Sequence, residues 1–143
     1  MCLCIVISFI FAMNQHQARN WKVLTWNVRG INSSWKWDLV KNKVICVQCD
    51  IICFQETKKD SFDSSFLRKI YPPPFDSFDF LPSVGASGGI LIAWKSSLFS
   101  SNKLSSSSFA LTIDFCSKHD NSKWVLTYVY GPYTKEGKGL FLN

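Results

Sequence analysis

Two hydrophobic runs, separated by a helical segment, constrain the fold of this chain more than any other feature. Residues 21–28 are apolar on both alternating faces and predict a central strand, and residues 51–54 predict a second, short buried strand. Apolar side chains recur at helical spacing through residues 35–47 between them. Such a crossover places its two strands parallel. The polar residues Asn27 and Glu56, which end the two runs, are therefore expected at the same edge of a sheet.

The rest of the chain predicts one further helix and four further strands. Ser33 or Ser34 is a suitable N-cap for the first helix, and a run of prolines after Tyr71 ends the second. Eight serines within residues 96–108 indicate a loop. Another helix is expected to begin near Glu136. We expect one mixed sheet with both complete helices on one face, with strands near 21–28, 51–56, 75–81, 89–95, 108–116 and 123–130, and helices near 35–47 and 61–70.

Composition indicates a single folded, basic domain. The chain has 143 residues, of which 47% are hydrophobic and 15% aromatic, and this argues against disorder. Its formal charge of +6 and its pI near 9.1 suit a polyanion such as nucleic acid. Charge alone favours that class of partner only slightly, because many solvated protein faces are basic.

Six cysteines raise the question of a metal or redox site. Cys46 and Cys49 form a C-x-x-C with Cys53 close by, but no second C-x-x-C completes the four ligands of a zinc site. We therefore interpret the cysteines as buried reduced thiols, which is typical of a reducing compartment.

Four short motifs, in order along the chain, resemble the endonuclease/exonuclease/phosphatase superfamily, whose fold is DNase I-like. Each motif alone is weak, but four in the family's order, covering residues 21 to about 143, form a specific pattern. The phrase Trp-Asn-Val-Arg-Gly-Ile-Asn resembles in particular the endonuclease domain of plant LINE-type retrotransposons. The motifs are Trp26-Asn27-Val28-Arg29-Gly30, Gln55-Glu56-Thr57, Gly88-Gly89 before a strand, and Tyr130-Gly131-Pro132.

The resemblance implies metal-assisted hydrolysis of DNA phosphodiesters and a role for each matched residue. Glu56 would bind the divalent metal, Mg²⁺, which prefers carboxylate and water oxygens. Asn27 would orient the phosphate or the metal's ligands, and Tyr130 would place its hydroxyl near the scissile phosphate. Arg29 stands where some members carry a second metal-binding Asp; a cation there suits phosphate instead.

Each of these residues also has a simpler interpretation. Asn27 after a strand can turn the chain, an isolated Glu56 is more often a solvated surface residue, and Tyr130 can be one more aromatic on a strand face. The order of the motifs, rather than any single residue, favours the functional interpretation.

Two later elements of the family have no counterpart in these 143 residues: an Asp-x-Asn pair after the Tyr strand and an Asp-His pair near the end. His119-Asp120-Asn121 precedes the Tyr strand, has the wrong spacing and is expected in a hairpin turn. We therefore expect a fragment that is inactive as given. Its fold class is α/β (α+β), a DNase I-like four-layer sandwich of which the chain supplies about the first sheet with its flanking helices.

The expected domain boundary follows from the same resemblance. Residues 1–19 are expected to be an apolar extension outside the fold, and residues 20–143 a partial endonuclease/exonuclease/phosphatase domain. The apolar run is too short to span a bilayer, which needs roughly 20 residues. It also lacks the leading basic residue of a signal peptide. A nuclear or cytoplasmic location is favoured, and secretion stays open if the first 13 residues act as a signal.

A truncated sheet would leave apolar residues in water. Trp21, Val23 and the strand with Ile90, Ile92 and Trp94 are apolar on a face that the helices do not reach, so we expect a large exposed patch and self-association through it. Three functions stay open: a truncated Mg²⁺-dependent DNA endonuclease, a non-catalytic remnant that binds nucleic acid weakly, and another phosphoesterase of the same superfamily. The Trp-Asn-Val-Arg-Gly phrase argues against the third.

Overall fold

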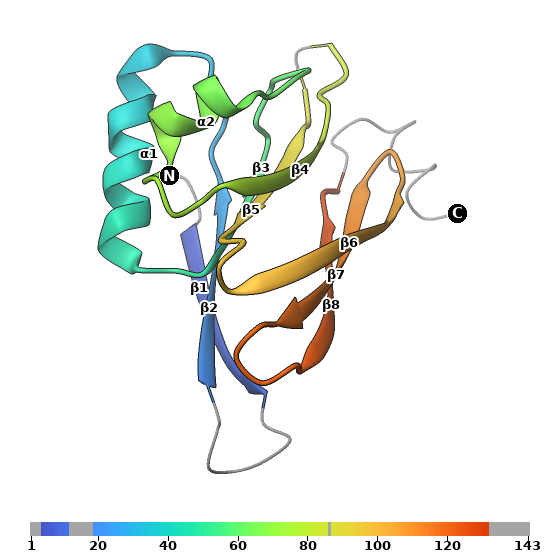
Figure 1. Cartoon of the computed structure of the whole chain (residues 1–143). Helices are drawn as coiled ribbons and strands as arrows, with labels where there is room; N and C mark the ends of the chain where they lie inside the picture. The colour runs from blue at the N-terminus through green and yellow to red at the C-terminus, as the bar shows by residue number, and fades with distance from the viewer. Residues whose placement is uncertain (1–3, 12–18, 86, 132–143) are drawn as a thin grey trace.

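The structure, a computed structural model, describes residues 4–11, 19–85 and 87–131. Helices α1 and α2, a five-stranded sheet and a three-stranded sheet form three layers (Figure 1). The larger sheet has the strand order β1-β2-β3-β5-β4 and the smaller the order β6-β7-β8. The elements are β1 Cys4–Phe11, β2 Arg19–Asn27, α1 Ser34–Val47, β3 Ile51–Gln55, α2 Ser64–Ile70, β4 Ser77–Leu81, β5 Ile90–Trp94, β6 Phe99–Ser106, β7 Ala110–Ser117 and β8 Lys123–Val129.

The predicted strand–helix–strand unit is confirmed as β2-α1-β3. Strands β2 and β3 are parallel, with Asn27 opposite Gln55, so both strands end at the same edge of the larger sheet. The other pairings in this sheet are antiparallel. Ser33 is the N-cap of α1, as expected, although its side chain makes no capping hydrogen bond. The α/β fold class is therefore correct, and so is the edge at which the two polar motifs lie.

Both helices cover one face of the larger sheet, which confirms the predicted arrangement (Figure 1). Val40 and Val44 of α1 are buried in the same cluster as Ile52 and Phe54 of β3. The shorter α2 is capped by Asp63, whose carboxylate accepts a hydrogen bond of 2.7 Å from the Phe66 N–H. A side-chain cap of this kind satisfies one of the donors that a helix start leaves open.

The expectation of a single sheet is wrong. Strands β7 and β8 form a separate sheet with β6, and the serine-rich segment predicted to be a loop is strand β6. Only Phe99 of β6 is buried, and its other residues are exposed. Hydropathy cannot reveal such a strand, because its backbone pairing with β7 defines it and burial does not.

The expected exposed apolar patch is also wrong for the described residues. The smaller sheet packs face to face on the larger one, on the side opposite the helices (Figure 1). Trp21 and Ile92 are fully buried between the sheets, and Trp94 is 6% exposed. Phe99, Phe115 and Trp124 supply the opposing aromatic surface. The face through which self-association was expected is thus covered within the chain.

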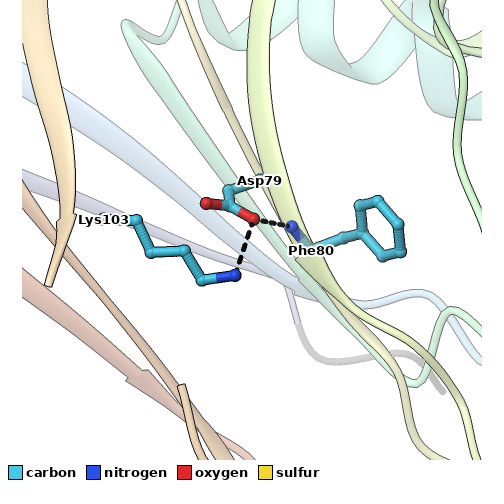
Figure 2. Close-up of polar contacts among 3 residues, drawn as sticks. All are labelled: Asp79, Phe80 and Lys103. Carbon is cyan, nitrogen blue, oxygen red and sulfur yellow. Dashed lines mark hydrogen bonds and ion pairs between the residues drawn. The ribbon is translucent and has the colours of Figure 1, made fainter. Parts of the chain in front are cut away.

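Polar contacts at the sheet edges supplement this packing. Asp79 of β4 accepts hydrogen bonds from the Phe80 N–H at 2.8 Å and from Lys103 Nζ of β6 at 3.3 Å (Figure 2). Both side chains are partly exposed, so this ion pair contributes little stability. Burial raises the pKa of Tyr128 on β8, the nearby Cys53 raises it further, and a side-chain hydrogen bond with Thr25 of β2 opposes them.

Residues 4–11 form a strand that the sequence did not predict. Strand β1 pairs antiparallel with β2, from Cys4 opposite Trp26 to Phe11 opposite Arg19. The domain boundary at residue 20 stays a prediction, and the helix expected near Glu136 lies outside the described residues. No helix formed by the described residues is long and apolar enough to cross a membrane.

The cysteines agree in part with the expected buried thiols. Cys49 and Cys53 are buried and form no disulfide, whereas Cys46 is exposed. Burial, followed by the neighbouring Cys49, raises the pKa of Cys53, so this thiol stays protonated. No group of three metal-ligating side chains occurs among the residues that the structure describes.

Candidate functional site

Three loops meet at the edge where β2 and β3 end: residues 27–32, 55–59 and 88–89, here called the site edge. Backbone hydrogen bonds join them directly. Gly30 N donates to Glu56 O at 2.6 Å and Ile31 N to Thr57 O at 3.1 Å. Lys58 N in turn donates to Gly88 O at 2.9 Å. The loops therefore form one continuous, hydrogen-bonded shelf rather than independent flexible segments.

Left-handed backbone conformations are concentrated at this shelf. They occur at Arg29, Gly30, Glu56, Lys58, Gly88 and Gly89, with φ between 50° and 95°. Non-glycine residues adopt such values at a cost of order 1–3 kcal/mol each, and strain of this kind clusters at functional sites. The non-glycine members Arg29, Glu56 and Lys58 are charged, which makes them the residues of interest here.

Asn27 lies at the end of β2, where it turns the chain. Its Oδ1 accepts a hydrogen bond of 3.1 Å from the Arg29 N–H, so the turn-forming interpretation of this residue is correct. The same bond leaves the amide Nδ2 as the free polar atom of the side chain. A free N–H₂ donor suits a phosphate oxygen and cannot ligate a metal.

Two side chains from α1 hold the first loop in place. Lys36 Nζ donates to the carbonyl oxygens of Val28, Arg29 and Gly30 at 3.1, 2.9 and 2.9 Å. Trp37 Nε1 donates to Ile31 O at 2.8 Å. Sequence reasoning missed both residues, because only the fold shows that the first turn of α1 lies over the loop that precedes it.

Glu56 is a charged residue whose side chain is mostly buried, with 7% of its surface exposed. No described residue donates a hydrogen bond to its carboxylate, and none forms an ion pair with it. Although the side chain as a whole is mostly buried, its carboxylate oxygens still reach solvent, so a cation from solution can contact them. This residue therefore fits a bound cation, with most of the cation's ligands coming from water or substrate.

Tyr130, directly after β8, reaches the same edge from the smaller sheet. Its N–H donates to Phe109 O at 2.8 Å. A Cβ built on Gly88 would lie 3.6 Å from Tyr130 Cε1, so the tyrosine ring borders the loop that is bonded to Lys58. The structure thus brings the loops of all three predicted site residues, Asn27, Glu56 and Tyr130, to one edge. Their chemical roles stay predictions.

Two exposed cations border the shelf. Arg29 is exposed, and the exposed Lys58 lies against Gly30, where an added Cβ would be 3.2 Å from Lys58 Cδ. Lys58 was not singled out from the sequence, although it follows the Gln-Glu-Thr motif directly. Two cations around the carboxylate of Glu56 suit an anionic group such as phosphate together with a metal cation.

His119 and Asp120 lie far from this edge. They occupy the turn between β7 and β8, at the opposite end of the hairpin from Tyr130. The Asp120 carboxylate accepts hydrogen bonds from Ser122 Oγ at 2.7 Å and Ser122 N at 3.0 Å, which together hold its pKa below the usual range. The expected position in a hairpin turn is confirmed, and this aspartate has a structural use there.

Comparison with known proteins identifies the family of this chain and a solved structure with a similar fold. In solved structures, the fold is similar to the crystal structure of the AP endonuclease LMAP from Leishmania major, with a TM-score of 0.56 and 22% sequence identity. The match covers 78% of this chain but 40% of that enzyme, so the chain spans less than half of its length. No curated protein matches the sequence. The pattern of the endonuclease/exonuclease/phosphatase family matches residues 24–133, which include the whole site edge, and the chain therefore belongs to the endonuclease/exonuclease/phosphatase family.

Proposed function

We propose that this chain is part of a Mg²⁺-dependent DNA endonuclease domain of the kind found in LINE-type retrotransposons. The observation that carries the proposal is Glu56, a mostly buried side chain whose carboxylate accepts no hydrogen bond from a described residue and lies at an edge bordered by cations. The likeness of Trp26-Asn27-Val28-Arg29-Gly30 to retrotransposon endonucleases supports the finer assignment.

Each site residue has a proposed task. Glu56 holds Mg²⁺, which supplies a Lewis acid for the phosphate oxygens. The free amide nitrogen of Asn27 donates to a phosphate oxygen, and Arg29 and Lys58 attract the DNA backbone through their charge. Tyr130 directs its hydroxyl toward the same phosphate. Lys36 keeps the loop of Asn27 rigid, which preserves the orientation of these donors.

We further propose that residues 1–143 alone bind DNA but do not cleave it at a useful rate. Proton transfer from water needs a base at the site edge. His119, the one histidine in the described part of the chain, lies at the other end of the hairpin. Groups that act as a catalytic unit fail as a unit, so a site without the His–Asp pair is expected to be slower by a factor on the order of 10⁴ or more.

Duplex binding with and without Mg²⁺ tests the metal role directly. Fluorescence anisotropy of a labelled duplex should report binding that Mg²⁺ tightens, because a cation held by Glu56 would also bind a phosphate oxygen of the DNA. Glu56→Gln should abolish that Mg²⁺ effect. Asp60→Asn removes an exposed carboxylate four residues further along the chain and should leave the effect intact.

Two results would contradict the proposal. Duplex binding that is indifferent to both Mg²⁺ and Glu56→Gln would favour a non-catalytic remnant that binds only through its charge. Nicking of supercoiled plasmid by the parent chain, lost in Glu56→Gln, would contradict the proposed inactivity of residues 1–143 while supporting the metal role.

A further inference from the structure

A shallow groove beside the site edge combines aromatic and basic side chains. Its volume is about 520 Å³, which is within the range of small-molecule sites. The side chain of Trp35 is 70% exposed. The residues that line the groove, here called the Trp35 groove, are Ser34, Trp35, Trp37, Asp38, Lys41 and Lys69.

The ammonium group of a lysine lies over each of the two indole rings of this groove. Lys36 Nζ lies 5.5 Å from the centre of the Trp35 ring, and Lys69 Nζ lies 4.5 Å from that of Trp37. Because Lys36 Nζ is also fixed by three carbonyl oxygens of the loop after β2, it has little freedom to move. Trp35 is thus supported by an anchored cation, while most of its surface faces water.

Charge around the groove favours an anionic partner. Lys41 and Lys69 line it, and Asp38 is its single acidic residue. Lys36 connects the groove to the loop that carries Asn27 and Arg29, so the positive charge continues from the groove to the site edge. An exposed ring among fixed cations matches the chemistry of single-stranded nucleic acid, in which bases stack on aromatic rings and phosphates contact lysines.

We propose that the Trp35 groove binds an unpaired nucleotide of a DNA strand that also contacts the site edge. The base stacks on Trp35, and the adjoining phosphates contact Lys41 and Lys69. This inference rests on the proposed action on DNA and adds a preference for DNA with an unpaired segment next to the site. The preference depends on side chains of α1 and on Lys69 of α2, which are separate from the residues proposed for chemistry.

The test compares single-stranded and duplex DNA on the whole chain. Anisotropy is measured with a labelled thymidine oligonucleotide of about 12 nucleotides, within the usual range of such sites, and with a blunt duplex of the same length. Trp35→Ala should weaken single-strand binding about tenfold, since stacking contributes about 1–3 kcal/mol per base, and should change duplex binding less than about twofold. Trp35→Phe should retain part of the affinity.

Ile45→Ala is the matched control. Ile45 lies on the same helix and is 52% exposed, but it does not line the groove. Its substitution should change neither affinity. Circular dichroism of each variant checks that the fold is retained, as expected for side chains that are mostly in water.

The remaining outcomes separate the two proposals. Duplex binding with no effect of Trp35→Ala on the single strand would overturn the groove assignment and leave the proposed function standing. Equal losses on both DNAs, or stronger competition by a poly-glutamate peptide than by the oligonucleotide, would also overturn it. A chain that binds neither DNA would overturn both.

Discussion

Asp50 and Asp76 lie at the end of the larger sheet opposite Glu56, and the three carboxylates have very different surroundings. Asp50 Oδ2 accepts a hydrogen bond of 2.9 Å from the Lys22 N–H. Asp76 accepts from Ser96 N at 2.8 Å and from Ser96 Oγ at 2.6 Å. Glu56 is more buried than either, yet no described residue donates to it.

The difference separates residues that build the fold from residues that the fold leaves available. At the far end, carboxylates complete turns that join neighbouring strands. At the site edge, backbone hydrogen bonds and left-handed residues perform that task, and the carboxylate of Glu56 stays free. A carboxylate that accepts no hydrogen bond from the fold and still reaches solvent is available as a ligand for a cation.

The largest expected effect concerns the backbone of the site edge. Gly89 has φ of 95°, and a Cβ built there would overlap Thr57 Oγ1. Backbone strain and overpacking each cost about 1–3 kcal/mol, so Gly89→Ala should lower the free energy of unfolding by about 3 kcal/mol or more. Urea unfolding followed by tryptophan fluorescence measures the change.

Gly85→Ala is the control for this prediction. Gly85 also has a positive φ, 62°, but nothing lies within 4 Å of the Cβ built there. Only the backbone cost should remain, about 1–2 kcal/mol. Equal losses at the two glycines would mean that the contact with Thr57 does not restrict the site edge.

A smaller effect, opposite in sign at the two ends, is expected when the carboxylates are neutralised. Asp50→Asn weakens a charge-assisted hydrogen bond and should destabilise the chain by about 1 kcal/mol. Glu56→Gln removes a partly desolvated charge that no described residue neutralises, and should stabilise the chain by up to about 1 kcal/mol in the absence of divalent cations. Urea unfolding in EDTA tests both.

In Mg²⁺ the parent chain should become more stable to unfolding than the Glu56→Gln variant, which reverses the order of stability expected in EDTA. A cation that binds only the folded parent raises its unfolding free energy and leaves the variant unchanged. Destabilisation by Glu56→Gln in EDTA would show that the carboxylate has a structural partner, and the contrast between the two ends would be lost.

The sequence predicted which residues lie at the site edge better than it predicted how the strands divide into two sheets. Asn27 and Glu56 follow the two strands of one crossover unit, and local periodicity together with the handedness of such units places them at one edge. The two helices predicted near residues 35–47 and 61–70 and the six predicted strands are correct for the same reason. Strand β6 could not be predicted, because seven of its eight residues are exposed and its existence depends on pairing with β7.

The side chain that holds the loop of the site edge in place, Lys36, could not be predicted from the sequence for a related reason. Lys36 is one of several lysines in a helix, and nothing local distinguishes it from the exposed Lys43. Its three carbonyl contacts arise only after the loop and α1 are placed together. The expectation of an exposed patch was wrong for the same reason. The alternation of buried residues within β7 shows that one face of the strand is apolar, but it does not show which other element that face packs against.

The smallest expected effect is the pH dependence that Asp76 contributes at the far end. The Ser96 hydroxyl, followed by the Ser96 N–H, lowers the pKa of Asp76 in the folded chain. A lowered folded pKa adds stability above the unfolded value, near 3.9, and that stability is lost as the pH falls through the folded value. Because Asp76 is exposed, water competes for these bonds, and the contribution should not exceed about 0.5 kcal/mol. Comparison of Asp76→Asn with the parent should show this difference at about pH 6, and the difference should shrink as the pH falls and the carboxyl is protonated in both the folded and the unfolded chain. Ser96→Ala should remove most of it, and a pH dependence unchanged in Ser96→Ala would show that the far-end carboxylate does not depend on this turn.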